Sequence, residues 1–135
     1  MKTSEQIEDI VAALAKAQEQ IGIAHKADEA KVVTKTAGTY TYKYSDLKQV
    51  LAVCQQPLAA AGIARIHGSE IDHPNRRVSI TSRRAKGSQY IETTIAIAIP
   101  TWGDGPPKAI TAQEIGSAQT YGIRYGLIAL CGIAT

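Results

Sequence analysis

The first clear pattern of apolar positions is helical. Near the start of the chain, apolar residues recur every three or four positions, as one buried helix face requires. Thr3 and Gln6 have the spacing of a capping box, so the pattern predicts a helix that opens at Thr3 and ends near Gly22. The apolar positions of this helix are Ile7, Ile10, Val11, Leu14, Ala17 and Ile21.

Two further helices are predicted in the same way. One follows the capping box of Asp46 with Gln49 and ends at Gly62, and Pro57 is expected to kink or divide it. The other follows Thr111, which pairs with Glu114, and runs to about Cys131. The apolar face of the middle helix consists of Leu47, Val50, Leu51, Cys54, Leu58 and Ala61.

Between the helices the period changes to two, which predicts strands. β-Branched and aromatic residues around Gly38 predict a hairpin over Lys31–Lys43. Three more strands are predicted over Ile63–Ile71, Arg76–Lys86 and Gln89–Pro100, separated by turns at 72–75 and 86–88. The last strand alternates most regularly, with Ile91, Thr93, Ile95, Ile97 and Ile99 on one face.

The predicted order is α-ββ-α-βββ-α. This order indicates an α+β fold, in which an antiparallel sheet has helices packed on one face. With 135 residues the chain is long enough for one core and too short for two, so we expect a single domain over residues 1–135.

Charge is unevenly distributed along the chain. Ten Lys or Arg and three Asp or Glu lie between Lys31 and Ile91, a balance of +7 within a total of +3, so the remainder carries −4. A basic middle segment suits a polyanionic partner. It also suits an ordinary solvated surface, and charge by itself leaves these two interpretations about equal.

Nothing in the chain indicates export or a membrane. The start is amphipathic and acidic rather than a signal peptide, and the apolar run over Ile123–Ile133 is too short and too polar to span a bilayer. Cys54 and Cys131 lack metal-ligand spacing and suggest no disulfide framework. We therefore expect a reducing, cytoplasmic compartment.

The last helix is unusually rich in small residues. Gly116, Ser117, Ala118, Gly122 and Gly126 are poor or neutral helix formers, and each glycine costs about 1 kcal/mol relative to alanine. Such a run predicts close approach to a sheet, another helix or a ligand backbone.

A polar stripe follows one side of this helix at three- and four-residue spacing. It contains Gln113, Ser117, Thr120 or Tyr121, and Arg124. Arginine suits a phosphate, and tyrosine suits base stacking or a phosphate hydrogen bond. The alternative is that Arg124 forms an ordinary surface ion pair and Tyr121 packs in the core.

Two motifs resemble a known family. The stretch Gly116-Ser117-Ala118-x-Thr120-Tyr121-x-x-Arg124-Tyr125-x-Leu127-x-x-Leu130-x-Gly132-Ile133 resembles the signature helix of the phage essential recombination function (ERF) family of single-strand DNA annealing proteins. The earlier Tyr42-Lys43-Tyr44-Ser45-Asp46-Leu47 is similar to that family's other recurring motif. With the matching order of elements, the resemblance covers about Gln6 to the end of the chain.

The resemblance implies a protein that forms rings or filaments, lays single-stranded DNA in a basic groove and anneals it to a complementary strand without ATP. It implies a fold similar to that of the eukaryotic strand-annealing ring proteins. The implied partners are single-stranded DNA, further copies of the chain, and a phage exonuclease or single-strand-binding protein. The implied setting is recombination and DNA repair by a bacteriophage or prophage in the bacterial cytoplasm.

The chain departs from the family pattern in two respects. Ile123 stands where the family usually has a first basic residue, and Gly122 stands where it usually has alanine, so Arg124 is left as the basic residue of the motif. A phosphate contact on this helix is then weaker or is supplied elsewhere. The family also commonly continues into a tail after this helix, so we expect residues 1–135 to be a core domain without it.

The predicted DNA contacts fall into three groups. Ser117, Tyr121 and Arg124 belong to the last helix. The hairpin contributes a tyrosine row beside lysines, which is typical of a stacking platform and equally of cross-strand packing. The third group flanks one strand, where it would clamp a second DNA strand at the rim or protect a sheet edge. The hairpin residues are Lys35, Tyr42, Lys43 and Tyr44, and the strand residues are Arg76, Arg77, Arg83, Arg84 and Lys86.

The sequence contains no motif that indicates a catalytic site. The chain has no cluster of carboxylates suited to a two-metal site and no phosphate-binding loop, and His25, His67 and His73 lack metal spacing. We expect no enzymatic activity, no cofactor and no metal. Two alternatives to DNA annealing stay open: a small RNA-binding module, and a structural oligomer whose basic segment meets acidic neighbours.

Overall fold

A computed structural model describes residues 1–22, 28–34, 38–44, 46–101, 103–106 and 108–134. It confirms the α+β class and the predicted order of elements, and it adds a two-residue strand at the start of the chain. The elements are β1 (Lys2–Thr3), α1 (Glu8–Gln18), β2 (Asp28–Thr34), β3 (Gly38–Tyr44), α2 (Leu47–Ala60), β4 (Ala64–Asp72), β5 (Arg77–Lys86), β6 (Gln89–Ala98) and α3 (Ala112–Cys131).

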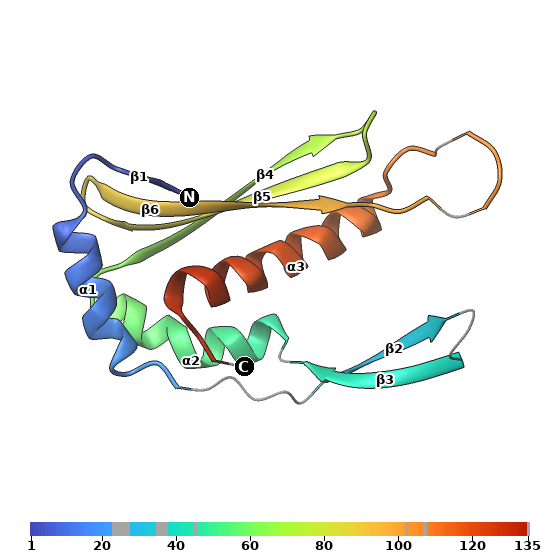
Figure 1. The fold of residues 1–135 in the computed structure, drawn as a ribbon. Coiled ribbons are helices and arrows are strands. Elements are labelled where there is room, and N and C mark those ends of the chain that lie inside the picture. Colours follow the sequence, from blue (N-terminus) through green and yellow to red (C-terminus); the bar gives the residue numbers. More distant parts are fainter. Residues whose placement is uncertain (23–27, 35–37, 45, 102, 107, 135) are drawn as a thin grey trace.

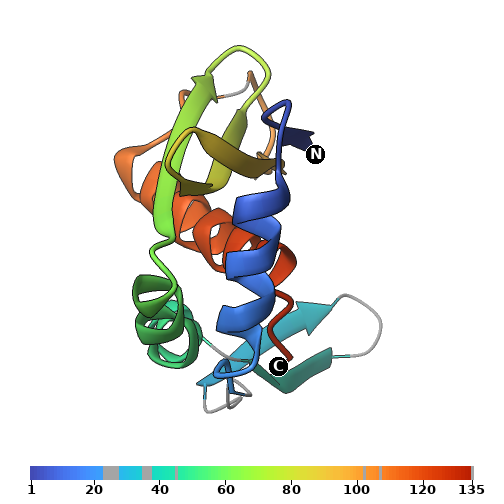
Figure 2. The ribbon, with the colours of Figure 1, turned by 90° about the vertical axis from the view of Figure 1, so that its left-hand side faces the viewer.

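The main sheet is antiparallel and four-stranded, in the order β1-β6-β5-β4. Strands β4 to β6 form the predicted meander, and their register places Gly68, Thr81 and Thr94 in one row. All three described helices lie on one side of this sheet, with α3 running beneath it and α1 and α2 gathered under one end (Figure 1). Figure 2 shows the same layers end-on, with the β2–β3 hairpin farthest from the sheet.

The start of α1 differs from the prediction. The helix begins at Glu8 without a side-chain cap, so the capping box predicted at Thr3 is wrong. Thr3 instead pairs with Ile91 in the sheet. The Oε1 atom of the buried Gln89 accepts the backbone N–H groups of Asp9 at 2.7 Å and Ile10 at 3.1 Å. A distant glutamine therefore satisfies the donors that a local cap usually satisfies.

The predicted limits of α2 are confirmed. The Asp46 side chain accepts the backbone N–H of Gln49, and the Gln49 side chain accepts the backbone N–H of Asp46, both at 2.8 Å. Pro57 lies inside the helix and does not divide it. Gly62, with a φ of 74°, follows the helix end in a conformation that favours glycine. The predicted apolar face packs into the main core, which contains Ile10, Leu14, Val50, Cys54, Leu58, Ile63, Leu127 and Leu130.

Helix α3 lies unusually close to β5. A Cβ atom added at Gly126 would lie 2.0 Å from Oγ of Ser82, and one at Gly122 would lie 2.7 Å from Ile80. The predicted close approach is therefore confirmed, and the sheet is what these two glycines approach. The capping box of Thr111 with Glu114 is also confirmed, and the helix ends at Cys131 before the left-handed Gly132. The contact of Gly122 and Gly126 with β5 fixes which side of α3 faces outward.

Candidate nucleic-acid interface

The outward side of α3 carries the polar stripe that the sequence predicted. Gln113, Ser117 and Thr120 are exposed, and Tyr121 is 46 % exposed. The opposite side of the helix, with Ala118, Gly122 and Gly126, is buried against the sheet. Because the small residues press against β5, the larger polar residues of the stripe are held toward solvent.

Two tyrosines and an arginine gather at the flank of this side that borders β6. The ring centroids of Tyr121 and Tyr125 are 4.5 Å apart at an interplanar angle of 40°. The Arg124 Cζ atom lies 5.2 Å from the Tyr121 ring centroid and 5.1 Å from that of Tyr125, within cation–π range. We call these three residues the tyrosine–arginine cluster. It offers aromatic faces for stacking beside a cation suited to a phosphate.

The hairpin lies on the same side of the sheet as α3 and beyond it (Figure 1). Its strands are antiparallel, with Val32 opposite Tyr40 and Thr34 opposite Gly38, so the predicted hairpin is confirmed. Tyr42, Lys43 and Tyr44 occupy the last three positions of β3. Their side chains, and Lys35 altogether, lie outside what the structure describes. The described backbone of β3 therefore lies on the side of α3 that faces away from the sheet.

Two of the predicted strand arginines lie on the opposite face of the sheet. Arg83 pairs with Glu92 at 2.7 Å, and its Cζ atom lies 3.7 Å from the Tyr90 ring centroid. Arg77 is exposed on this same face, which no described helix covers and which we call the open face; it lies opposite Asp72 in the register. The sheet separates both residues from the tyrosine–arginine cluster, so the structure does not bring these two predicted groups together.

Arg76 and Lys86 hold chain segments in place. Arg76 is buried, donates hydrogen bonds to the carbonyl oxygens of Ile99, Lys108 and Pro100, and pairs with Glu114 at 3.1 Å. It thereby ties the segment after β6 to the start of α3. The Lys86 Nζ atom donates to the carbonyl of Ala61 at 2.8 Å, just after α2. These contacts occupy both cations within the fold, so we leave them out of the interface.

Arg84 lies inside the main core. Its side chain is fully buried, whereas the sequence predicted its charge at the rim of the sheet. Nε donates to Sγ of Cys131 at 3.4 Å and Nη1 donates to the carbonyl of Arg83 at 3.0 Å. Nη2 has no hydrogen-bond partner within the described part of the chain. A guanidinium enclosed in this way does not reach a phosphate in solvent, so we leave Arg84 out of the interface as well.

The charge of Arg84 affects a neighbouring histidine. His67 lies opposite Ser82 in the register, and its Nδ1 atom is 3.0 Å from Oγ of Ser82. Burial, helped by the charges of Arg84 and Arg65, lowers the pKa of His67 to about 4. His67 is therefore neutral at pH 7.

We expect this shift to make stability depend on pH. The unfolded chain takes up a proton on His67 near pH 6.5, whereas the folded chain takes it up only near pH 4. Stability is therefore full above pH 6.5 and falls as the pH drops toward 4, by about 2 kcal/mol once partial exposure of the ring is allowed for. Urea unfolding at pH 7 and pH 4.5 measures the change.

The matched control for this prediction is the exposed His73. His67→Gln should flatten the pH dependence relative to the unmodified chain, and His73→Gln should leave it unchanged. An identical pH dependence in all three proteins would contradict the role of His67.

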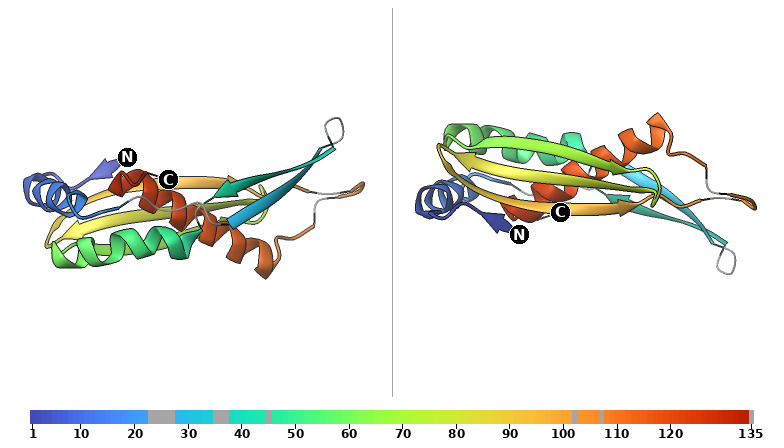
Figure 3. Two further views of the ribbon diagram at one scale, coloured as in Figure 1. Left: turned by 90° about the horizontal axis from the view of Figure 1, so that it is seen from below. Right: turned by 90° about the horizontal axis from the view of Figure 1, so that it is seen from above.

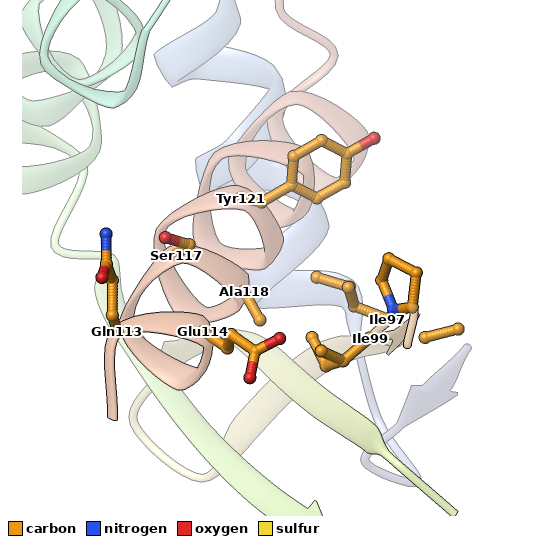
Figure 4. A pocket seen from close by; sticks show the side chains of 9 residues that line it. Ile97, Ile99, Gln113, Glu114, Ser117, Ala118 and Tyr121 are labelled. Atoms are coloured by element: carbon orange, nitrogen blue, oxygen red, sulfur yellow. The ribbon is translucent and has the colours of Figure 1, made fainter. Parts of the chain in front are cut away.

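An apolar groove lies beside the stripe, and the sequence did not predict it. It has a volume of about 370 Å³. Its lining includes Ile97 of β6, Ile99 just after β6, and Ser117, Ala118 and Tyr121 of α3 (Figure 4). The alternation in β6 predicted that the isoleucines face the helices. It did not reveal that α3 leaves this end of the face partly uncovered.

The described residues include neither a candidate metal site nor a helix that could span a membrane. No group of three or more His, Cys, Asp or Glu side chains among them is placed to hold a metal ion. Within the same ranges, no helix has the length and hydrophobicity that a membrane span requires.

Comparison with known proteins identifies the family. The family model described as the ERF superfamily matches residues 10–135, nearly the whole chain. No curated protein and no solved structure matches the chain. The match covers both motifs on which the resemblance was based, the β3 segment and helix α3. The chain therefore belongs to the ERF superfamily.

Proposed function

We propose that this protein binds single-stranded DNA and anneals complementary strands without ATP, acting as an oligomer. The observation that supports this most directly is the tyrosine–arginine cluster on the exposed side of α3, within the family's signature helix. The hairpin lies on the same side (Figure 1). In the proposed site, α3 is one wall and the hairpin is the other.

Annealing requires a particular kind of DNA contact. The Watson–Crick edges of the bound strand must stay free to pair, so the protein should hold phosphates and stack on bases rather than read their edges. Arg124 can contact a phosphate, Tyr121 and Tyr125 can stack, and the Ser117 hydroxyl, one turn away, can donate to the backbone. From the hairpin we propose Lys35, Tyr42, Lys43 and Tyr44 as further contacts.

Arg124→Ala should weaken binding to an oligothymidylate about tenfold, because it removes one charged phosphate contact. It should also reduce the slope of log affinity against log salt by about 0.7, the value for one phosphate of a single strand. Fluorescence anisotropy between 50 and 200 mM salt measures both quantities. Circular dichroism checks that the helix, in which Arg124 is only partly buried, stays folded.

Lys16→Ala is the matched control for this variant. Lys16 is exposed in the last turn of α1, so its loss removes the same charge away from the proposed site. We expect its affinity and salt slope to stay within twofold of the unmodified chain. Equal losses in the two variants would mean that only net charge matters, and no loss with Arg124→Ala would remove this residue from the site.

Annealing itself is tested with two complementary labelled oligonucleotides, without ATP, on protein sized in the same buffer. Faster pairing by an assembled protein is the expected result. Binding without faster pairing would reduce the proposal to a single-strand-binding protein. A marked preference for RNA over DNA of the same sequence would instead indicate recognition of the 2′-hydroxyl and an RNA-binding role.

A further inference from the structure

Strand β6 has an open edge without charged residues. Strand β1 covers only Ile91 and Glu92, and no described strand pairs with the outer side of Thr93–Ala98. This stretch reads Thr-Thr-Ile-Ala-Ile-Ala. Natural edge strands are usually blocked by charges, proline or bulges, because free N–H and C=O groups invite another strand. The open part of β6 has none of these protections.

Apolar surface lies directly beside this edge. A second hollow adjoins the groove, with which it shares Ile97 and Tyr121, and is lined by Ile95, Ala96, Ile97, Tyr121 and Tyr125. The tyrosines are 46 % and 40 % exposed. Unpaired strand backbone beside an unfilled apolar hollow is the arrangement that accepts an added strand.

The opposite edge of the same sheet is also open. Strand β4 is nine residues long and pairs only with β5 among the described strands. It exposes two large apolar residues, Ile66 at 50 % and Ile71 at 39 %. Figure 3 shows β4 and β6 on opposite sides of the sheet. Because each is antiparallel to β5, β4 and β6 run in the same direction.

We propose that a second copy of this chain pairs its β4 with the open stretch of β6, so that the sheet continues from one subunit to the next. The inference rests on the oligomer of the proposed function and names its contact surface. If the rows of the sheet continue across the contact, Ile71 of the neighbouring copy lies beside Ile97 and extends into the groove. Gly68 of the neighbouring copy then lies beside Thr94.

Charge favours this pairing over a two-fold contact between two β6 strands. On the open face, Arg77 lies in the row of the short Ala98; although Asp72 of its own chain is its register partner, it forms no ion pair within the described residues. Its guanidinium can extend over Ala98 toward Glu70 and Asp72 of an added β4. A β6–β6 contact would offer Arg77 only Glu92, which already pairs with Arg83, and would leave both β4 edges open. A β6–β4 contact joins two different edges, so each added copy again presents a free edge. The contact can therefore repeat and generate a ring or a filament.

Cysteine cross-linking tests the pairing directly. Thr94→Cys and Gly68→Cys are made in separate chains; both positions are exposed, and a side chain at Gly68 meets nothing within 4 Å. Cys54 and Cys131 are fully buried and stay out of the reaction. Within one chain the two positions are two strands apart, roughly 10 Å, which is beyond the reach of a disulfide.

We expect a mixture of the two variants to form a disulfide-linked dimer on mild oxidation, while each variant alone stays monomeric on a non-reducing gel. Dimers from Thr94→Cys alone would overturn the proposal in favour of a two-fold β6–β6 contact. An assembled protein that forms no cross-link in the mixture would overturn the edge pairing and leave the proposed function standing. A protein that is monomeric at every concentration would contradict both the edge pairing and the oligomer of the proposed function.

Ile97→Lys gives a second readout, because it places a charge in the groove beside the edge. By size-exclusion chromatography with light scattering, this variant should be monomeric at a concentration where the unmodified chain is assembled. Val11→Lys, at an exposed apolar position on α1, is the matched control and should assemble normally. Normal assembly of a folded Ile97→Lys variant would also overturn the proposal.

Discussion

Replacing Gly126 with alanine should lower the free energy of unfolding by about 3 kcal/mol and the melting temperature by roughly 10 °C. The added Cβ would lie 2.0 Å from Oγ and 2.6 Å from Cβ of Ser82. Ser82 is 1 % exposed on the central strand β5, so it has little room to move. The clash outweighs the roughly 1 kcal/mol by which alanine improves a helix relative to glycine. Thermal and urea unfolding measure the change.

Gly116 supplies the matched control in the same helix. A Cβ added there meets nothing within 4 Å, so Gly116→Ala should stabilise the protein by up to about 1 kcal/mol. Combining Gly126→Ala with Ser82→Gly should recover part of the loss, because the colliding atoms are gone. If Gly126→Ala were as stable as Gly116→Ala, then α3 would not lie against β5 as described.

The sequence predicted those elements whose signals are local. The boundaries of α2 and α3 followed from capping boxes and a terminal glycine, and the structure has both boxes. The start of α1 was mispredicted because its cap is Gln89, about 80 residues away, and no local pattern contains that contact. Strand β1 is two residues long, too short for any periodicity to reveal.

For the candidate site, prediction succeeded where spacing along one helix decides the outcome. Ser117, Tyr121 and Arg124 share a side of α3 because of the helical period alone. The strand arginines were harder to predict. Arg84 alternates with Val78 and Ile80 onto the face that the helices cover, but whether that end of the face is buried depends on how the end of α3 packs against it. Burial at strand ends is a tertiary property.

The open edge of β6 and its groove could not be predicted for a similar reason. The alternation over Gln89–Pro100 identified the strand and its two faces. It could not show that the pairing of β6 with β1 ends at Glu92, or that α3 leaves Ile95 and Ile97 half-buried. Both features depend on how separate elements meet, and together they form the proposed subunit contact.

Arg84→Met should raise the free energy of unfolding by about 2 kcal/mol and leave DNA affinity unchanged. A buried guanidinium is costly unless an anion compensates it, and hydrophobic replacements of buried ions are often stabilising by 1–4 kcal/mol. Arg84 has no carboxylate partner among the described residues, and its cross-strand neighbour in β4 is another cation, Arg65. Methionine keeps most of the side-chain volume and removes both the charge and the unsatisfied Nη2.

Arg84→Ala separates charge from packing. It removes the same charge but leaves a cavity beside Cys131 in the core, so it should be less stable than Arg84→Met by about 3 kcal/mol. Urea unfolding of the two variants measures this difference, and anisotropy with the oligothymidylate checks binding. If both variants were strongly destabilised by the same amount, the charge itself would be needed in the core. Loss of DNA affinity in a stable Arg84→Met variant would return Arg84 to the interface, because a fully buried guanidinium can affect binding only if that end of the core opens to DNA.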